Sequence, residues 1–363
     1  MSAHESEDIP ADRRAIERGS CNDPCDCLVV GGGPAGLMAA LYLRRYHRGV
    51  LLVDAGHSRA MYIDRSHNYP GFPEGIAGDE LLTRMRQQLI AVGGRVHPGE
   101  VTALELATLA PQLQTDDRLG ATAFAAHIGG RRVTARSVMI ASGVVDGVPD
   151  LPGIDELRQS GMLRQCPICD GHEHRNQRIV VIGDGAHAAR EAAFIANYSA
   201  EVSWCALRDE GSGAEVATPS CVRRLPRAKR VGVNTRMRPG AGAAVMLQTV
   251  DGAHHRFDVV YAALGVQPRS QIARSLGAQL DARNNIIVDA HCESSVPGLF
   301  AAGDVVSALD QLAVAVGHGA IAATAIHNRL PPQVAAPRAG TRLAPTLPKG
   351  SDVVGPASVG VRG

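Results

Sequence analysis

The sequence is poor in aromatic residues and has no excess of charge of one sign. Aromatic side chains make up 3% of the 363 residues, and 37 Lys and Arg nearly cancel 36 Asp and Glu, which leaves a formal net charge of +1. Few side chains are available to stack on bases, and no overall field attracts a polyanion or an anionic membrane surface. We therefore expect no nucleic-acid partner.

Long hydrophobic runs are also missing. No window approaches the ~18 unbroken apolar residues of a membrane span. The first twenty residues mix acidic and basic side chains and lack the apolar core of a secretory signal. We expect a cytoplasmic protein with no membrane partner. In a reducing cytosol, its 8 cysteines should not form a structural disulfide framework.

The remaining composition is that of an ordinary globular chain, with 45% hydrophobic and 20% charged residues. Its length suggests roughly two or three domains. Residues 1–24 are polar and without pattern, and residues 331–363 are rich in Pro, Gly and Ala. We predict a mobile N-terminal tail and a disordered C-terminal tail.

The glycines are concentrated at a turn between an apolar run and a helical pattern. Residues 27–30 suit a buried parallel strand, and the turn that follows carries the spacing Gly31-x-Gly33-x-x-Gly36. The amino end of a helix presents free N–H groups that bind a pyrophosphate, and Asp54, at the end of the next strand, can accept hydrogen bonds from a ribose. This combination predicts a dinucleotide-binding domain.

A second, weaker copy of this pattern follows later in the chain. Residues 179–182 precede Gly183-x-Gly185-x-x-Ala188, and a helix and another strand follow. The pattern favours a second nucleotide, most plausibly a nicotinamide, although a fold that no longer binds one has the same pattern. Arg208 is the basic residue near the end of the second strand. Two such units predict an α/β protein with two doubly wound Rossmann-like domains.

The sequence Cys166-Pro167-Ile168-Cys169 is the centre of the predicted chemistry. Two intervening residues let the sulfurs meet across one helical turn, and this spacing often makes a thiol pair redox-active. Asp170 follows directly and could move the proton that thiol–disulfide exchange requires. Half a zinc site and inert buried cysteines are the alternatives. Because zinc needs two more ligands at suitable spacing, we expect no metal.

Other candidate residues have weaker patterns. Cys21, Cys25 and Cys27 could form a second cluster, but Cys27 fits a strand and the other two a linker. His318 lies in a helix of small residues, either as a core histidine or as a proton-handling group. The basic run at residues 221–230 is either a solvated face or a binding surface for an anion or an acidic partner.

Five motifs occur in the order found in low-molecular-weight thioredoxin reductases, and the sequence resembles that family from about Asp26 to Leu330. The motifs read LVVGGGPAGL, HNYPGF, CPICDG, IVVIGDGAHAAREAAF and LFAAGDV. The resemblance implies a discontinuous FAD-binding domain over residues 25–143 and 269–330. It implies an NAD(P)-binding domain over residues 144–268 that carries the cysteine pair. It also implies a homodimer whose nicotinamide domain rotates between two positions.

The resemblance assigns roles to individual residues. It makes Cys169 the sulfur facing the flavin, Cys166 the exchanging sulfur and Asp170 the acid/base. The FAD contacts that it implies are Gly31, Gly33, Pro34, Ala35, Gly36, Asn68, Val101, Ala141, Ser142, Gly143, Asp304, Gln311 and Leu312.

The expected reaction transfers electrons from NADPH or NADH through FAD and the cysteine pair to a thioredoxin-like protein or a small disulfide. Members specific for NADPH carry several arginines after the second Rossmann strand, and here Arg208 remains while Ser212 replaces the last of them. NADH and ferredoxin are therefore open as donors. A dithiol oxidase, which runs the exchange in reverse, and a non-enzymatic redox sensor are further alternatives.

Overall fold

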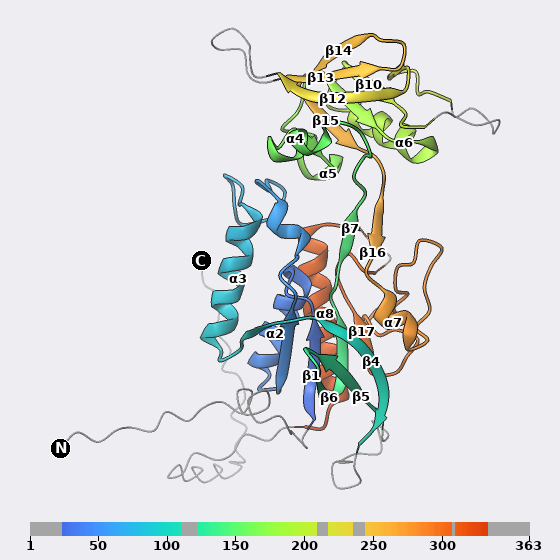
Figure 1. The fold of residues 1–363 in the computed structure, drawn as a ribbon. Helices are drawn as coiled ribbons and strands as arrows, with labels where there is room; N and C mark the ends of the chain where they lie inside the picture. The colour runs from blue at the N-terminus through green and yellow to red at the C-terminus, as the bar shows by residue number, and fades with distance from the viewer. Residues whose placement is uncertain (1–23, 110–121, 209–216, 235–243, 307–308, 333–363) are drawn as a thin grey trace, which may run out of the picture. The chain divides into compact units, whose positions relative to one another are not determined.

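The computed structural model describes residues 24–109, 122–208, 217–234, 244–306 and 309–332 (Figure 1). The two predicted tails lie outside these ranges, apart from Pro24, Pro331 and Pro332. Cys21 and Ser212 also lie outside the described residues.

A mixed sheet forms around the first glycine turn. Its strands run in the order β3-β2-β1-β6-β5-β4, and β17 also pairs with β6. The pairs among β3, β2, β1, β6 and β17 are parallel, whereas β5 and β4 are antiparallel. The strands are β1 (Cys25–Val30), β2 (Val50–Asp54), β3 (Val96–Pro98), β4 (Val101–Thr108), β5 (Thr122–Ile128), β6 (Arg131–Ile140) and β17 (Leu299–Ala301).

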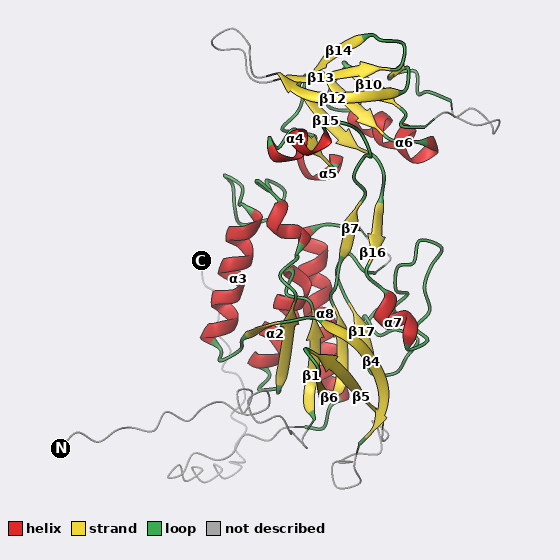
Figure 2. Cartoon of the chain, in the orientation of Figure 1, coloured by secondary structure: helices red, strands yellow, loops and turns green. Residues whose placement is uncertain are grey.

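Helices cover one face of this sheet (Figure 2). They are α2 (Pro34–Arg45), α3 (Gly78–Ala91) and α8 (Leu312–Arg329). Two shorter helices, η1 (Arg59–Tyr62) and α7 (Gln271–Ser275), belong to the connecting segments. As expected, Pro34 occupies the first turn of α2, where its missing N–H has no intrahelical partner to lose. A Cβ on Gly319 would lie 2.4 Å from the Ala35 carbonyl oxygen, so this glycine lets α8 approach α2 closely.

A buried arginine, Arg48, connects the carboxyl end of α8 to the turn between α2 and β2. Arg48 is 2% exposed. Its guanidinium donates to His327 Nδ1 at 3.1 Å and to the carbonyl oxygens of Pro331 at 2.9 Å, His327 at 3.1 Å and Leu330 at 3.4 Å. The carbonyl groups of His327 and Leu330 are among those that a helix leaves without partners at its carboxyl end, and Pro331 follows directly after them.

The second glycine turn lies in a separate parallel sheet with the order β11-β10-β9-β15-β8. Its strands are β8 (Leu163–Arg164), β9 (Ile179–Ile182), β10 (Val202–Cys205), β11 (Arg223–Leu225) and β15 (Val259–Ala262). The helices of this part are α4 (Ile154–Gln159), α5 (Pro167–Asp170) and α6 (Gly185–Ile195). An antiparallel sheet of β12 (Ala228–Asn234), β13 (Ala244–Thr249) and β14 (His254–Phe257) completes it. The predicted α/β fold class, with parallel strands after each glycine turn, is confirmed.

Both connections between these sheets run through one narrow ribbon. The chain leaves β6 through β7 (Val144–Asp146) and returns after β15 through β16 (Val266–Pro268), and these two strands pair antiparallel. The pairing arises because two extended segments run side by side and satisfy each other's backbone groups.

We predict that Arg48→Met destabilises the fold. The variant keeps a long apolar stem but leaves the buried carbonyl groups at the end of α8 unsatisfied, so the free energy of unfolding should fall by about 2–4 kcal/mol. Urea unfolding followed by far-UV circular dichroism measures this. Arg45→Met, at an exposed position of α2, is the control. Equal losses in the two variants would contradict the role of Arg48.

Candidate functional site

A cavity of about 640 Å³ opens at the carboxyl ends of the strands of the first sheet. Gly31, Gly33, Pro34, Ala35 and Asp54 line it. The other lining residues that the sequence singled out are Asn68, Val101, Ala141, Ser142, Gly143, Cys166, Cys169, Asp170, Asp304, Gln311 and Leu312. The fold thus brings most of the expected flavin contacts and the cysteine pair to one space.

Two glycines of the first turn are required by close backbone contacts. Gly31 has φ +108°, and a Cβ on it would lie 2.3 Å from the Ala141 carbonyl oxygen. A Cβ on Gly36 would lie 1.9 Å from the Gly31 carbonyl oxygen, which fits the expectation that this glycine lets helix and strand pack closely. Gly36 is buried behind the cavity, whereas Gly33 is the N-cap of α2 at the cavity wall.

The turn and the strand ends offer the donors and acceptors that a dinucleotide needs. The first turn of α2 has N–H groups without intrahelical partners, and such groups bind pyrophosphate. Asp54 ends β2 and accepts the Gly56 N–H at 3.2 Å, while Arg86 lies 3.7 Å from its other oxygen. The cavity volume is within the range of ligand pockets. These residues fit FAD.

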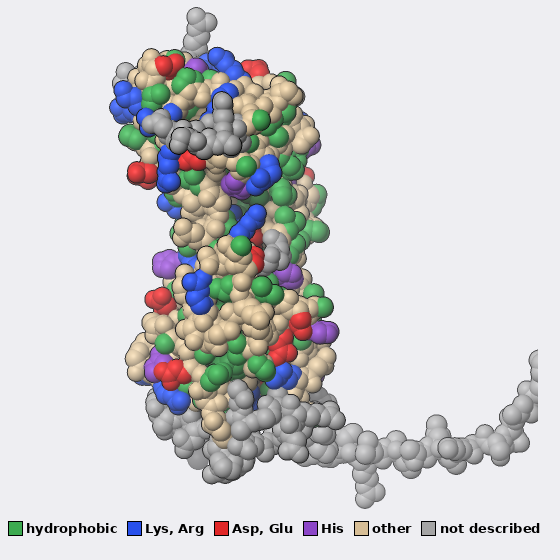
Figure 3. Space-filling model, turned by 90° about the vertical axis from the view of Figure 1, so that its right-hand side faces the viewer, with side chains coloured by type: hydrophobic (Ala, Val, Ile, Leu, Met, Phe, Trp, Pro, Cys, Tyr) green, Lys and Arg blue, Asp and Glu red, His purple; other side chains and the backbone are tan. Residues whose placement is uncertain are grey.

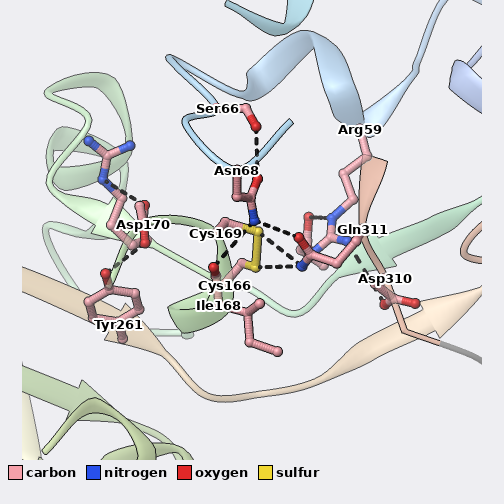
Figure 4. Close-up of a disulfide and its surroundings, with 12 residues drawn as sticks. Arg59, Ser66, Asn68, Cys166, Ile168, Cys169, Asp170, Tyr261, Asp310 and Gln311 are labelled. Atoms are coloured by element: carbon pink, nitrogen blue, oxygen red, sulfur yellow. Dashed lines mark hydrogen bonds and ion pairs between the residues drawn. A yellow bond between two sulfur atoms is a disulfide. The ribbon is translucent and has the colours of Figure 1, made fainter. Parts of the chain in front are cut away.

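Cys166 and Cys169 form a disulfide across the short helix α5 (Figure 4). Cys166 is the N-cap, Pro167 begins the helix, and the Cys169 N–H donates to the Cys166 carbonyl oxygen at 2.9 Å. The Cα atoms are 5.3 Å apart, as one helical turn allows. The sulfurs are bonded to each other, so the two cysteines that the sequence singled out form a pair.

Hydrogen-bonded side chains connect this disulfide to the segment between η1 and α3. Gln311 Nε2 lies 3.5 Å from Cys166 Sγ and 3.4 Å from Cys169 Sγ. Asn68 Nδ2 donates to Gln311 Oε1 at 2.9 Å, and Ser66 Oγ donates to Asn68 Oδ1 at 2.9 Å (Figure 4). Gln311 therefore touches both the cavity and the two sulfurs, and Asn68, which also lines the cavity, contacts Gln311 and the Ile168 carbonyl oxygen between the two cysteines.

Asp170 ends α5 in a largely enclosed environment. Its side chain is 18% exposed, and burial raises the pKa of the carboxyl. The Tyr261 hydroxyl donates to Oδ1 at 2.6 Å, and Arg164 Nε lies 3.6 Å from Oδ2; both lower that pKa in opposition to burial. A raised pKa moves the titration of this carboxyl toward the range in which an acid/base group can exchange protons with thiols.

Sequence reasoning missed Arg59, which gathers three carboxylates at the cavity. Its guanidinium lies 2.7 Å from Asp146, 3.2 Å from Asp304 and 3.9 Å from Asp310. Burial raises the pKa values of Asp304 and Asp310, the latter to about 6 with a contribution from the Asp304 charge, and Arg59 opposes both shifts. Arg59 lies in none of the sequence motifs. The only signal was that Asp146, Asp304 and Asp310 would need a basic partner if they were buried.

The second glycine turn is not among the residues that line this cavity. A Cβ on Gly183 would lie 2.3 Å from the Ala263 carbonyl oxygen, whereas Gly185 has φ +66° and faces open space. Ala188 is buried in α6. The Asp184 carboxylate accepts the N–H groups of Leu207 at 2.8 Å and Arg208 at 3.2 Å, and the Arg208 side chain is 90% exposed.

The weaker candidates fall in several places. Cys27 is a buried residue of β1, as predicted, and Cys25 is half-buried in the same strand. His318 lies on α8, where burial lowers its pKa and the charge of Asp304 opposes this. Basic and acidic side chains are interspersed on the face shown in Figure 3.

Within the described part of the chain, no group of three or more His, Cys, Asp or Glu could hold a metal ion. None of the helices in these ranges is both long and apolar enough to cross a membrane.

Comparison with known proteins shows which proteins this chain resembles. Residues 25–319 match the family model described as pyridine nucleotide-disulphide oxidoreductase. A thioredoxin reductase of Mycolicibacterium smegmatis is 29% identical over 310 residues, which cover 82% of this chain and 94% of that protein. The crystal structure of HlmI matches with a TM-score of 0.72 at 26% identity, over 84% of this chain and 92% of that one. A thioredoxin reductase from Streptococcus pyogenes MGAS5005 matches with a TM-score of 0.71 at 26% identity, over 85% and 99%.

We predict that Asp310→Asn stabilises the protein above pH 6 and has little effect at pH 4. The folded pKa of about 6 exceeds the unfolded value near ~3.9, so the folded state binds more protons and loses stability as the pH rises between these values. The difference in Tm between variant and wild type should grow from near zero at pH 4 to about 2 °C above pH 6. Asp150→Asn, at an exposed position, is the control. A difference independent of pH would contradict the prediction.

Proposed function

Because the chain belongs to the pyridine nucleotide-disulphide oxidoreductase family, we propose that it is an enzyme carrying an electron pair from NAD(P)H, by way of FAD, to the Cys166–Cys169 disulfide and on to a substrate disulfide. Its relatives include thioredoxin reductases, so the family supports a thioredoxin-like protein as the substrate, with a small disulfide as the alternative. The observation that carries the proposal is that the disulfide lines the same cavity as the first glycine turn.

FAD would be held by the residues that the cavity brings together. The N–H groups at the start of α2 would bind its pyrophosphate and Asp54 a ribose. Asp304, Asn68, Gln311 and Leu312 complete the wall between that end and the disulfide. When bound, FAD supplies a redox group that can accept a hydride and return two electrons to a disulfide.

The cysteine pair performs the exchange with the substrate. In the reduced pair, the Cys166 thiolate attacks the substrate disulfide; a Cys166–substrate bond forms, the substrate S–S bond breaks, and the leaving thiolate takes a proton from Asp170. The Cys169 thiol then returns a proton to Asp170 and attacks Cys166. The Cys166–Cys169 bond re-forms, and the second substrate sulfur leaves as a thiolate and takes that proton. Two electrons and two protons have then reached the substrate.

The nicotinamide would bind at the second glycine turn, at Gly183, Gly185 and Ala188. Arg208 follows the end of β10, with Asp209 and Glu210 directly after it in the sequence, and a basic residue at this place suits the 2′-phosphate of NADPH. This supports NADPH over NADH. Arg208 is the only one of the family's arginines that remains, so the sequence alone does not establish the use of NADPH. A second candidate function is therefore the oxidation of a dithiol with transfer of the electrons to oxygen. The family resemblance favours a homodimer, which sedimentation tests.

We predict that NADPH reduces the flavin of the purified protein faster than NADH. Anaerobic titration, followed by bleaching of the flavin absorbance near its visible maximum, measures this. Arg208→Ala should remove most of the preference by weakening the NADPH reaction alone. Bleaching by neither nucleotide, together with release of hydrogen peroxide when a dithiol is added in air, would favour the dithiol oxidase instead.

We predict opposite behaviours for the two cysteine variants. Cys169→Ser should retain FAD, lose turnover by more than about 1,000-fold and still react with DTNB through Cys166, because the attacking sulfur remains and the resolving one is gone. Cys166→Ser should react far more slowly.

Both variants are made in a Cys21→Ser/Cys221→Ser background, since Cys221 is an exposed thiol that would also react. The reactivity of a variant lacking Cys166 and Cys169 together is subtracted. Faster reaction of Cys166→Ser than of Cys169→Ser would reverse the assignment of the two sulfurs.

A further inference from the structure

The phenol of Tyr261 is buried against the carboxyl of Asp170. Tyr261 is fully buried in β15 at 0% exposure, and its hydroxyl donates to Asp170 Oδ1 at 2.6 Å. Its ring lies edge-on to His174, with the centroids 6.1 Å apart. The hydroxyl therefore lies against one of the two carboxyl oxygens beside the redox pair (Figure 4).

Strand register places a second group on the other oxygen. β15 pairs in parallel with β8, and Tyr261 and Arg164 are direct partners in that register. Register partners on neighbouring strands point to the same face of a sheet. Arg164 Nε accordingly lies 3.6 Å from Asp170 Oδ2, and the chain reaches Cys166 two residues after Arg164. The same edge of the sheet thus places the carboxyl and the disulfide.

The two contacts make the carboxyl oxygens unequal. Burial raises the pKa of Tyr261, so the phenol stays protonated and remains a donor over the physiological pH range. A donor at Oδ1 requires that oxygen to accept. When Asp170 is protonated, its proton therefore lies on Oδ2, the oxygen facing Arg164.

We propose that Tyr261 is a positioning residue for Asp170: its hydroxyl fixes the rotation of the carboxyl and leaves Oδ2 as the oxygen that holds and releases the proton. The role of this proton in disulfide exchange rests on the proposed function. Tyr261 acts through Asp170 and contacts neither sulfur in this structure. Because its hydrogen bond favours the ionised carboxylate, it also sets the pH at which Asp170 gives up its proton.

Charged groups from several elements act on Asp170, and each affects the expected shift. Arg164 on β8 and His174 after α5 favour ionisation, whereas the neighbouring Glu173 opposes it. Arg164 is itself 3.9 Å from Asp64, which follows η1. Tyr261→Phe leaves all of these groups in place and removes one hydroxyl, so a change in the titration of Asp170 reports the lost hydrogen bond.

The test measures the titration of Asp170 directly and its consequence for exchange. Carboxyl carbon-13 resonances of aspartate-labelled, FAD-loaded protein are titrated, and Asp170 is assigned by the signal missing in Asp170→Asn. We expect the midpoint to move upward by about one pH unit in Tyr261→Phe. In the Cys21→Ser/Cys221→Ser background, exchange of the dithiothreitol-reduced cysteine pair with an alkyl disulfide such as hydroxyethyl disulfide, whose leaving thiolate must take a proton, should lose rate as Asp170 ionises, and this falling limb should move upward by the same amount.

Tyr198→Phe is the matched control, because its ring packs beside Gly171, directly after Asp170, and no hydrogen bond from it to Asp170 is present among the described residues. Its titration and falling limb should match the wild type. In an Asp170→Asn background, Tyr261→Phe should cause no further change in the pH profile. Flavin content and Tm confirm that each variant is folded.

Three results are decisive. An Asp170 midpoint that does not move in folded Tyr261→Phe overturns the inference. A midpoint that moves while the falling limb stays in place also overturns it, because the positioned carboxyl would then take no part in exchange. A wild-type protein that exchanges with DTNB at no pH would overturn the proposed function instead, and the resonance titration would still decide whether Tyr261 controls the proton of Asp170.

Discussion

The contact of the Gln311 amide with both sulfurs is the interaction on which the site depends. It lies at the start of α8, and it meets a disulfide carried by α5 in the other part of the fold. Asn68 holds the amide from a third segment. Through these groups the cysteine pair lies at the wall of the cavity that begins at the first glycine turn.

Partial burial of charge accompanies this arrangement. Asp170, Asp304 and Asp310 all have pKa values raised by burial, and each lies near an arginine that opposes the shift. Arg59 also contacts Asp146 in the ribbon between the sheets. Isolated carboxylates would be costly here, because removing a charge from water is unfavourable unless a partner compensates it. The arginines therefore permit carboxyl groups of unequal acidity to lie around one cavity.

The two glycine turns show how local sequence and final geometry differ in importance. Both follow a buried strand and precede a helix, and both have a first glycine that a Cβ would push into a neighbouring carbonyl group. Their surroundings differ. The end of β2 carries Asp54, whereas after β10 the backbone N–H groups of Leu207 and Arg208 donate to the Asp184 carboxylate. The first two glycines have the same spacing in both turns, and Ala188 replaces the third glycine, so the spacing does not reveal this difference.

The sequence by itself determined the two strand–turn–helix units, the α/β class and the Cys166–Cys169 pairing, because each depends on residues within a few positions of one another. Expected contacts such as Asn68 and Gln311 came from family motifs. Only the tertiary structure showed that Arg59 gathers three carboxylates, that β7 and β16 pair, and that Tyr261 holds Asp170. Tyr261 and Asp170 are 91 positions apart. Such contacts are set by strand register and chain crossing, which leave no periodic signal in the chain.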